Sequence, residues 1–170
     1  MYKGLCLITM CFSLVAPAFL AAQTTADEIE TLLDTGAVSY GQAARFVLEA
    51  SDVTVTDDPA QAFQYAAEHN WLPKKASADQ TARLDGIALL VMQSFDIKGG
   101  LWYSLFKSPH YAYRELVYQG IIQGRIDPAM AVSGDNFLYM VNLLLSMQEA
   151  DASAELTPQL ADNDTADLDE

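Results

Sequence analysis

The feature that most constrains the fold of this chain is a weak internal repeat. Residues 58–95 align with residues 108–145 at an offset of fifty, without a gap. Four positions are identical, and the apolar positions also keep register, so that Trp71-Leu72 aligns with Ile121-Ile122. A shared apolar pattern at a fixed period of this size is typical of helical repeat proteins.

A third copy of the second half of this unit lies upstream, at an offset of forty-four. The aligned apolar residues are Ala43, Ala44, Phe46 and Val47, then Ile87, Ala88, Leu90 and Val91, then Phe137, Leu138, Met140 and Val141. Their spacing of i, i+1, i+3, i+4 places them on one face of a helix. A shorter helical pattern precedes each long one. The sequence therefore predicts an all-α fold, a small helical bundle of three helix-loop-helix repeats, with Ser39 and Ser133 at N-cap positions.

The N-terminal residues have the pattern of an export signal. Lys3 supplies positive charge, a short apolar core follows, and small residues suited to cleavage precede residue 23, which predicts a signal peptide over 1–22. An uncleaved anchor is the alternative. Cys6 and Cys11 both fall within this segment, so the mature chain would hold no cysteine for a disulfide or a metal. Lipidation at Cys11 stays open as a further alternative.

The C-terminal residues 149–170 differ in composition from the repeats at 23–148. They carry eight acidic residues, no basic residue and no aromatic residue. Because such a segment buries little apolar surface, we expect a disordered acidic tail. The tail accounts for eight of the fourteen net negative charges, and the remaining basic residues form no stripe. We therefore expect no nucleic-acid partner, because phosphate contacts require a basic face.

A short motif in the third copy resembles a known family. The GIIQG turn at residues 120–124, followed by Asp127, Pro128 and Val132-Ser133, resembles the S-layer homology repeat. The resemblance covers roughly residues 27–146, strongly in the third copy and faintly in the first. It implies a small all-α bundle of three repeats in a pseudo-threefold arrangement, which binds cell-wall polysaccharide and tethers exported proteins.

The chain departs from the family at the residue implied in gripping anionic glycans. The arginine of the family's helix start corresponds here to Tyr40, Leu84 and Gly134. Arg83 and Arg125 lie nearby but at other positions. The resemblance therefore supports the fold of the family more directly than its glycan-binding site.

Residue types needed for catalysis or metal binding are sparse. His69 and His110 are the only histidines, and no acidic residue stands at metal-ligand spacing from them. No pair of carboxylates and no nucleophile motif stands out. We therefore expect no metal, no cofactor and no enzyme activity.

The most unusual segment is rich in aromatic residues and begins at Gly99-Gly100. One interpretation is that Leu101, Leu105 and Phe106 close the core between two repeats. The other is that side chains of this region line an exposed groove for a sugar ring or a peptide. The candidate ligand-binding residues are Trp102, Tyr103, Tyr111 and, as cations for an anionic group, Arg114 and Arg125.

These observations predict a non-catalytic binding module, exported to the periplasm or cell envelope of a bacterium. Its expected partner is cell-wall polysaccharide, peptidoglycan or an envelope protein, bound in the groove between the second and third copies. The alternative is a protein- or membrane-interaction adaptor that uses the aromatic segment at residues 99–113, with membrane contact but no span.

Overall fold

The fold is all-α, as the sequence predicts. The computed structural model describes residues 27–54, 56–124 and 126–165. Within those residues the backbone forms helices joined by loops, with only isolated β-bridges such as Ser39 to Thr81. The predicted signal peptide at 1–22 and Arg125 lie outside the described residues.

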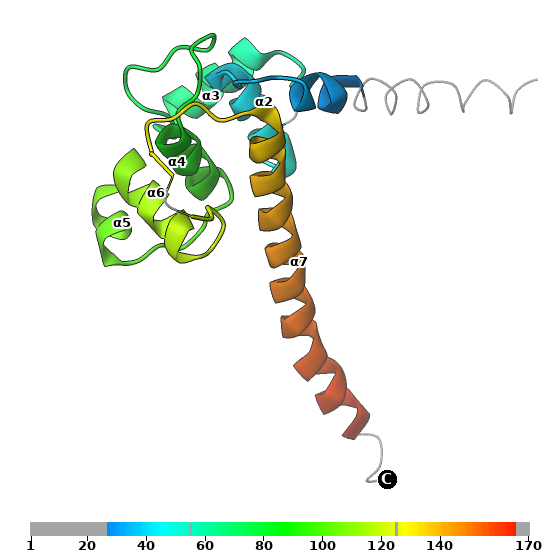
Figure 1. The fold of residues 1–170 in the computed structure, drawn as a ribbon. Coiled ribbons are helices and arrows are strands. Elements are labelled where there is room, and N and C mark those ends of the chain that lie inside the picture. Colours follow the sequence, from blue (N-terminus) through cyan, green and yellow to red (C-terminus); the bar gives the residue numbers. More distant parts are fainter. Residues whose placement is uncertain (1–26, 55, 125, 166–170) are drawn as a thin grey trace, which may run out of the picture.

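The helices follow the predicted order of short and long elements (Figure 1). Residues 27–33 are helical, and they are followed by α2 (Tyr40–Ala50), α3 (Pro59–Glu68), α4 (Leu84–Ser94), α5 (Leu101–Phe106), α6 (Pro109–Tyr118) and α7 (Gly134–Thr165). The helix at 27–33 and helices α2, α3, α4, α6 and α7 stand where the sequence predicts helices. Helix α5 is an addition, because the sequence indicates only a bend between repeats at that point.

Polar side chains define where the helices start. Ser39 caps α2 in a capping box, in which its Oγ accepts from Gln42 N at 3.2 Å and Gln42 Oε1 accepts from Ser39 N at 2.9 Å. Asp58 caps α3 by accepting from Ala60 N at 2.9 Å. Asp85 and Asp135 lie in the first turns of α4 and α7, where a carboxylate favours the helix dipole, as the sequence predicts.

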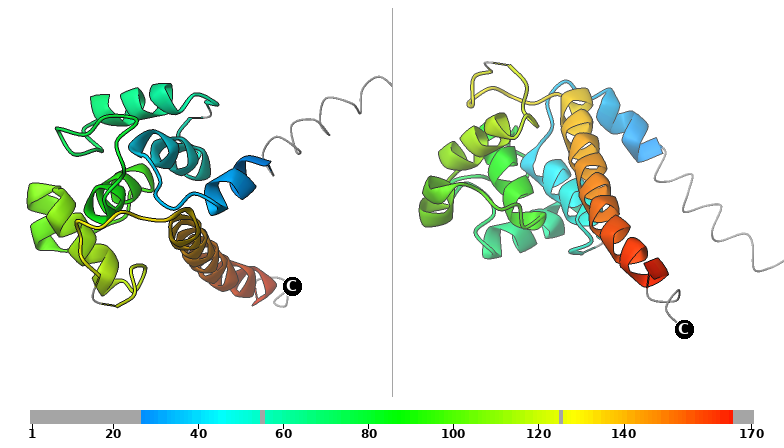
Figure 2. Two further views of the ribbon diagram at one scale, coloured as in Figure 1. Left: turned by 45° about the horizontal axis from the view of Figure 1, so that its top comes forward. Right: turned by 90° about the horizontal axis from the view of Figure 1, so that it is seen from below.

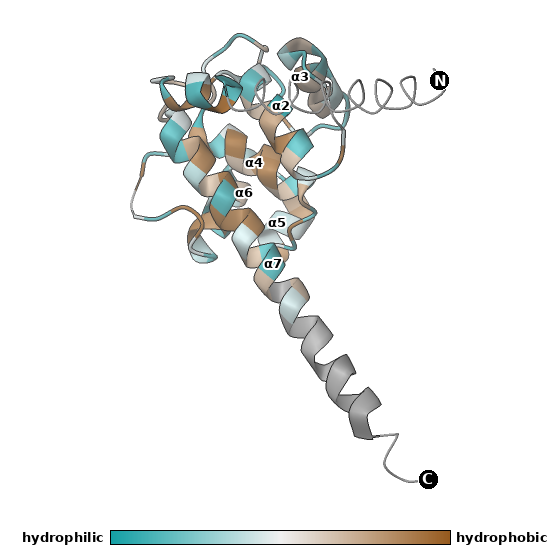
Figure 3. Ribbon diagram, turned by 90° about the vertical axis from the view of Figure 1, so that its right-hand side faces the viewer, coloured by the Kyte–Doolittle hydropathy of each residue, from teal (hydrophilic) through white to brown (hydrophobic). Residues whose placement is uncertain are grey.

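The predicted apolar faces meet in one core. Helix α2 packs against α3, α4 and α7, and α4 packs against α6. Figure 3 shows the hydrophobic colour concentrated on α4, in the middle of the body. The repeat-equivalent residues that are buried are Ala43, Ala44, Val47, Ile87, Ala88, Leu90, Val91, Phe137, Met140 and Val141. Phe46 and Leu138 are partly buried against the same core.

Backbone hydrogen bonds connect the start of each long helix to a loop of another repeat. Tyr40 N donates to Gln80 O at 3.0 Å, and Leu84 N donates to Met130 O at 3.0 Å. Gly134 N donates to Thr35 O at 2.8 Å, which closes the ring of loops. Only glycine fits at position 134, because a Cβ there would overlap the carbonyl group of Leu32.

Helix α7 enters the segment 149–170, for which the sequence predicts a disordered acidic tail. Helix α7 continues to Thr165 and extends beyond the body of the molecule (Figure 1). Residues 149–160 are rich in Ala, Glu, Leu and Gln, which have high helix propensity. A helix that begins in the core can therefore extend into them, because its first turns already provide the nucleus.

Candidate binding surface

Helix α5 and its neighbour α6 present a set of aromatic and aliphatic side chains, all of them exposed except Tyr111, which is half-buried. We call this set the aromatic surface, and it consists of Leu101, Trp102, Leu105, Phe106, Tyr111 and Tyr118. It lies at the edge of the body opposite the helical residues 27–33 and the extension of α7 (Figures 1 and 2).

The structure holds α5 in place by its backbone ends and by one buried side chain. Gly100 N donates to Glu115 Oε2 of α6 at 2.9 Å, and Ser104 Oγ donates to Gly99 O at 3.2 Å. Tyr103 points inward, where its hydroxyl accepts from Gln93 Nε2 of α4. Lys107 ends the helix in the left-handed conformation, with φ of 37°.

The rest of α5 faces outward. Leu101 is 79% exposed and Leu105 67%, while Trp102 is 60% and Phe106 54% exposed. Burying a side chain of this size stabilises a protein by roughly 1.5–3 kcal/mol. A helix that exposes four such side chains and buries one has therefore left most of its apolar surface available for a partner.

The aromatic rings of this surface lie nearly parallel to one another. The centroids of Trp102 and Phe106 are 6.2 Å apart with planes 9° apart, and those of Trp102 and Tyr111 are 6.3 Å apart with planes 14° apart. Phe106 and Tyr111 complete the triangle at 5.6 Å and 23°. Tyr111 is half-buried, so it anchors the two more exposed rings to α6.

The predicted site residues divide into three groups. Trp102, Tyr111 and Arg114 come together around a shallow hollow of about 190 Å³ between α5 and α6. Tyr103 reaches the wall of this hollow, but the prediction that it is an exposed surface residue is wrong, since it is only 4% exposed. Burial raises the pKa of Tyr103, and the hydrogen bond from Gln93 partly offsets this. Arg125 lies outside the described residues.

The alternative interpretation of this segment is also wrong. Leu101, Leu105 and Phe106 do not close the core between repeats, because all three are more than half exposed. On α5 only Tyr103 faces the core. A run of apolar residues as short as α5 does not reveal from its sequence which side faces the body.

A second hollow, which the sequence does not indicate, lies under the loop at residues 121–132. Its volume is about 230 Å³, and its walls are mainly apolar, with Ile121, Ile122, Met130, Val132, Tyr139 and Met140. Ile121 and Ile122 are buried, as the GIIQG pattern predicts. Gln123 and Asn136 provide its polar atoms. None of the described residues that line this hollow is charged.

The three positions of the family's arginine have no exposed cation. Tyr40 is 1% exposed and Leu84 is 6% exposed, and Gly134 carries no side chain. The Tyr40 ring packs against Gly86, and its hydroxyl accepts from Arg83 N at 3.3 Å. Burial raises the pKa of Tyr40. Position 40 is thus part of the core.

The nearby cation Arg83 is engaged within its own helix start. Its Nη2 and Nε atoms donate to the two carboxylate oxygens of Asp85 at 2.8 and 3.2 Å. This bidentate pair at the start of α4 occupies the guanidinium group. Arg83 is therefore a weaker candidate for ligand binding than Arg114.

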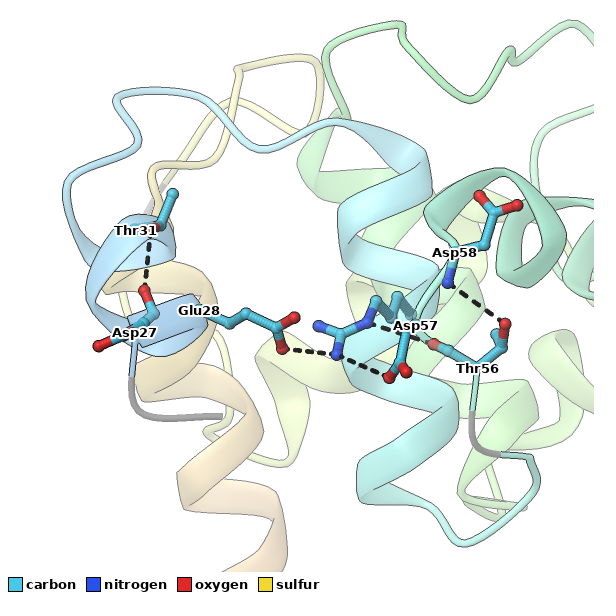
Figure 4. A network of polar contacts seen from close by, with 7 residues as sticks. Asp27, Glu28, Thr31, Thr56, Asp57 and Asp58 are labelled. Atoms are coloured by element: carbon cyan, nitrogen blue, oxygen red, sulfur yellow. Dashed lines mark hydrogen bonds and ion pairs between the residues drawn. The ribbon is translucent and has the colours of Figure 1, made fainter. Parts of the chain in front are cut away.

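Among the described residues, Arg45 is the cation that is buried, and its contacts join separate segments of the fold (Figure 4). Its Nη2 lies 2.6 Å from Glu28 Oε2 and 3.5 Å from Asp57 Oδ1. Its Nε donates to Thr56 O at 3.2 Å. Arg45 thus ties the N-terminal helix at 27–33 and the segment before α3 to α2, and it is not free to bind a ligand.

The histidines sit at helix ends among aromatic rings. His69 ends α3, and its ring stacks on Tyr65 with centroids 4.2 Å apart. His110 lies against Tyr111 in the first turn of α6. Within residues 27–54, 56–124 and 126–165, no group of three or more potential metal ligands is gathered to hold an ion.

Comparison with known proteins identifies no relative. The chain matches no protein family, no curated protein and no solved structure. Among the helices of the described residues, none combines the length and apolar character needed to cross a membrane.

Proposed function

We propose that this protein is a non-catalytic binding module of the bacterial cell envelope and that it binds through the aromatic surface of α5 and α6. The observation that carries the proposal is the exposure of Leu101, Trp102, Leu105 and Phe106 on one short helix. Trp and Tyr dominate the energetics of many binding surfaces, and clustered exposed apolar residues mark such surfaces.

The arrangement of the loops supports a scaffold like the S-layer homology repeat. The links from Tyr40 to Gln80, from Leu84 to Met130 and from Gly134 to Thr35 stand at repeat-equivalent helix starts and close a ring. We infer from them a pseudo-threefold arrangement of the three repeats. A scaffold of this kind acts by presenting surfaces, which agrees with a binding role.

The departures from the family favour a different binding surface on this scaffold. The family's arginine positions are filled by Tyr40 and Leu84, which are buried, and by Gly134. Arg114 is instead exposed beside the aromatic surface. We therefore place binding on α5 and α6 and not at the starts of the long helices.

The carboxylates near this surface support a non-catalytic role. Glu115 lines the hollow, but its Oε2 accepts from Gly100 N and its Oε1 accepts from Gln119 Nε2 at 3.2 Å. It holds α5 against α6 in this way. No second carboxylate lines the hollow within the described residues, so the two-carboxylate geometry of glycan hydrolysis is not formed there.

Co-sedimentation with isolated bacterial cell envelopes, which contain both wall and membrane, tests the proposal. The chain from Gln23 onward should bind saturably, and the double change Trp102→Ser and Phe106→Ser should weaken binding at least about tenfold. The matched control is Ile29→Ser with Leu33→Ser, which removes two exposed apolar side chains from another helix. Equal binding by both double variants would contradict the proposal.

A further inference from the structure

We propose that the aromatic surface is a membrane-docking surface, which inserts α5 into the interfacial region of a bilayer that contains anionic lipids. This inference rests on the proposed function and names the partner of the same surface. It predicts binding to lipid in the absence of any wall polymer or envelope protein.

The polarity of α5 favours hydrocarbon over sugar as the occupant. A sugar-binding platform needs polar side chains beside its aromatic rings to bond the hydroxyl groups. On α5 the polar side-chain groups are the hydroxyl of Ser104, which donates to Gly99 O, and the hydroxyl of buried Tyr103, which accepts from Gln93 Nε2. The neighbours of Trp102 and Phe106 on the outer face are Leu101 and Leu105, which offer no hydrogen bond. Leucine and tryptophan on one face, with tyrosine beside them, are typical of segments that lie in the membrane interface.

The charge around α5 is opposite to that of the whole chain. Residues 98–118 contain Lys98, Lys107 and Arg114 against the single acid Glu115, which gives a net charge of +2, while the whole chain carries −14. All three cations are exposed. Basic side chains next to an exposed apolar helix complement the negative surface of anionic lipids.

The helical part of the acidic segment, residues 149–165, extends away from this surface (Figure 1). Residues 149–170 hold eight acidic residues, and the part of α7 that carries most of them extends from the opposite side of the body from α5 (Figures 1 and 2). The nearest acids to α5 are Asp96, which precedes Gly99-Gly100, and Glu115, which is bonded to Gly100. A bilayer can therefore approach α5 without facing the acidic end of α7.

The test is flotation of the chain from Gln23 onward with unilamellar vesicles of phosphatidylethanolamine and phosphatidylglycerol. Vesicles of phosphatidylcholine provide the uncharged comparison. We expect binding to the anionic vesicles, with weaker binding to phosphatidylcholine and at high salt. The change Trp102→Ser with Phe106→Ser should reduce vesicle binding at least about tenfold. The single change Leu101→Gln should also weaken vesicle binding. Because Leu101 is the most exposed residue of α5, this change should affect the fold least.

A charge-reversal pair separates local from overall electrostatics. Lys107→Glu, next to α5, should weaken binding to anionic vesicles about fivefold or more, whereas Lys74→Glu, an exposed residue in the loop before α4, should change it little. Both variants change the net charge by the same amount. Equal effects of the two would contradict a local lipid contact.

Other outcomes assign the surface to another occupant and overturn the inference. Absence of vesicle binding together with capture by purified, lipid-free sacculi would make wall polymer the ligand and leave the proposed function standing. Absence of vesicle binding together with a concentration-dependent dimer that the Trp102 and Phe106 changes abolish would make a second copy the occupant. Absence of binding to vesicles, sacculi and whole envelopes would overturn the proposed function as well.

Discussion

Helices α4 and α5 follow each other in the chain and are both strongly apolar, yet they have opposite relations to solvent. Nine of the eleven residues of α4 are buried, whereas α5 buries only Tyr103 of its six. Helix α4 is surrounded, since it packs against α2 and α6, while α5 packs mainly against α6. Apolar composition therefore shows only that a side chain can be buried. The number of neighbouring elements decides whether it is.

The largest effect on stability should come from shortening a side chain of α4, whereas the same kind of change on α5 should have little effect. Leu90→Ala removes a fully buried side chain, so we expect a loss of about 2–5 kcal/mol in the free energy of unfolding. Leu105→Ala removes an exposed one and should change it by less than about 0.5 kcal/mol. Urea denaturation of both variants measures the difference. Similar losses for the two would show that α5 is packed in solution.

A smaller effect should follow from adding volume to α4. In Gly86→Ala the new Cβ would overlap the ring of Tyr40, and overpacking of this kind costs about 1–3 kcal/mol. The matched change is Gly100→Ala on the α5 side, where a Cβ would lie in ordinary contact with Glu115 Oε2 at 3.4 Å. Thermal unfolding should show a clear loss for the first variant and little change for the second.

Tyr103 is buried, as most residues of α4 are, so removing its hydroxyl should have a measurable but modest effect on the free energy of unfolding. Tyr103→Phe breaks the hydrogen bond from Gln93 and should cost about 1 kcal/mol at neutral pH. Because burial raises the pKa of Tyr103 in the folded protein, its contribution is complete below the ordinary tyrosine pKa and is lost as the pH rises toward the folded value.

The stability of the wild type should therefore fall more steeply than that of Tyr103→Phe above about pH 10. Urea denaturation at neutral and alkaline pH gives both slopes. Parallel curves for the two proteins would mean that the Tyr103 hydroxyl is not buried.

The smallest effect should come from the far end of α7. Truncation after Gln148 keeps every residue of α7 whose side chain the structure describes as buried, the last of which is Leu144, so the melting temperature should stay nearly unchanged. Helicity measured by circular dichroism should fall, because residues 149–165 are helical. A large drop in melting temperature would show that this segment packs on the body.

The periodic parts of the fold are the parts that sequence reasoning predicts. The repeated spacing around Ala43, Ile87 and Phe137 identifies three long helices and their buried faces, because one packed face leaves a period of about 3.6 residues. The N-cap role of Ser39 follows from its chemistry, since its hydroxyl can bond a free amide group. Local rules of this kind need no knowledge of the neighbours.

The candidate surface is only partly predictable from the sequence, because it depends on contacts between distant parts of the chain. Trp102, Tyr111 and Arg114 are brought together as the aromatic segment suggests, but the inward direction of Tyr103 depends on Gln93, ten residues earlier on another helix. For residues 149–165 composition favours disorder, whereas the helix propensity of their Ala, Glu, Leu and Gln residues favours continuation of α7. Exposure and long-range contacts are tertiary properties that a local pattern does not encode.

The most direct test of the central claim, that α5 is exposed in the free protein and covered in the bound one, is quenching of Trp102 fluorescence by acrylamide. In a Trp71→Phe variant, Trp102 is the single tryptophan. We expect strong quenching of Trp102 in the free protein and marked protection of Trp102 when isolated cell envelopes are added. Weak quenching in the free protein, or equal quenching in both states with binding intact, would contradict it.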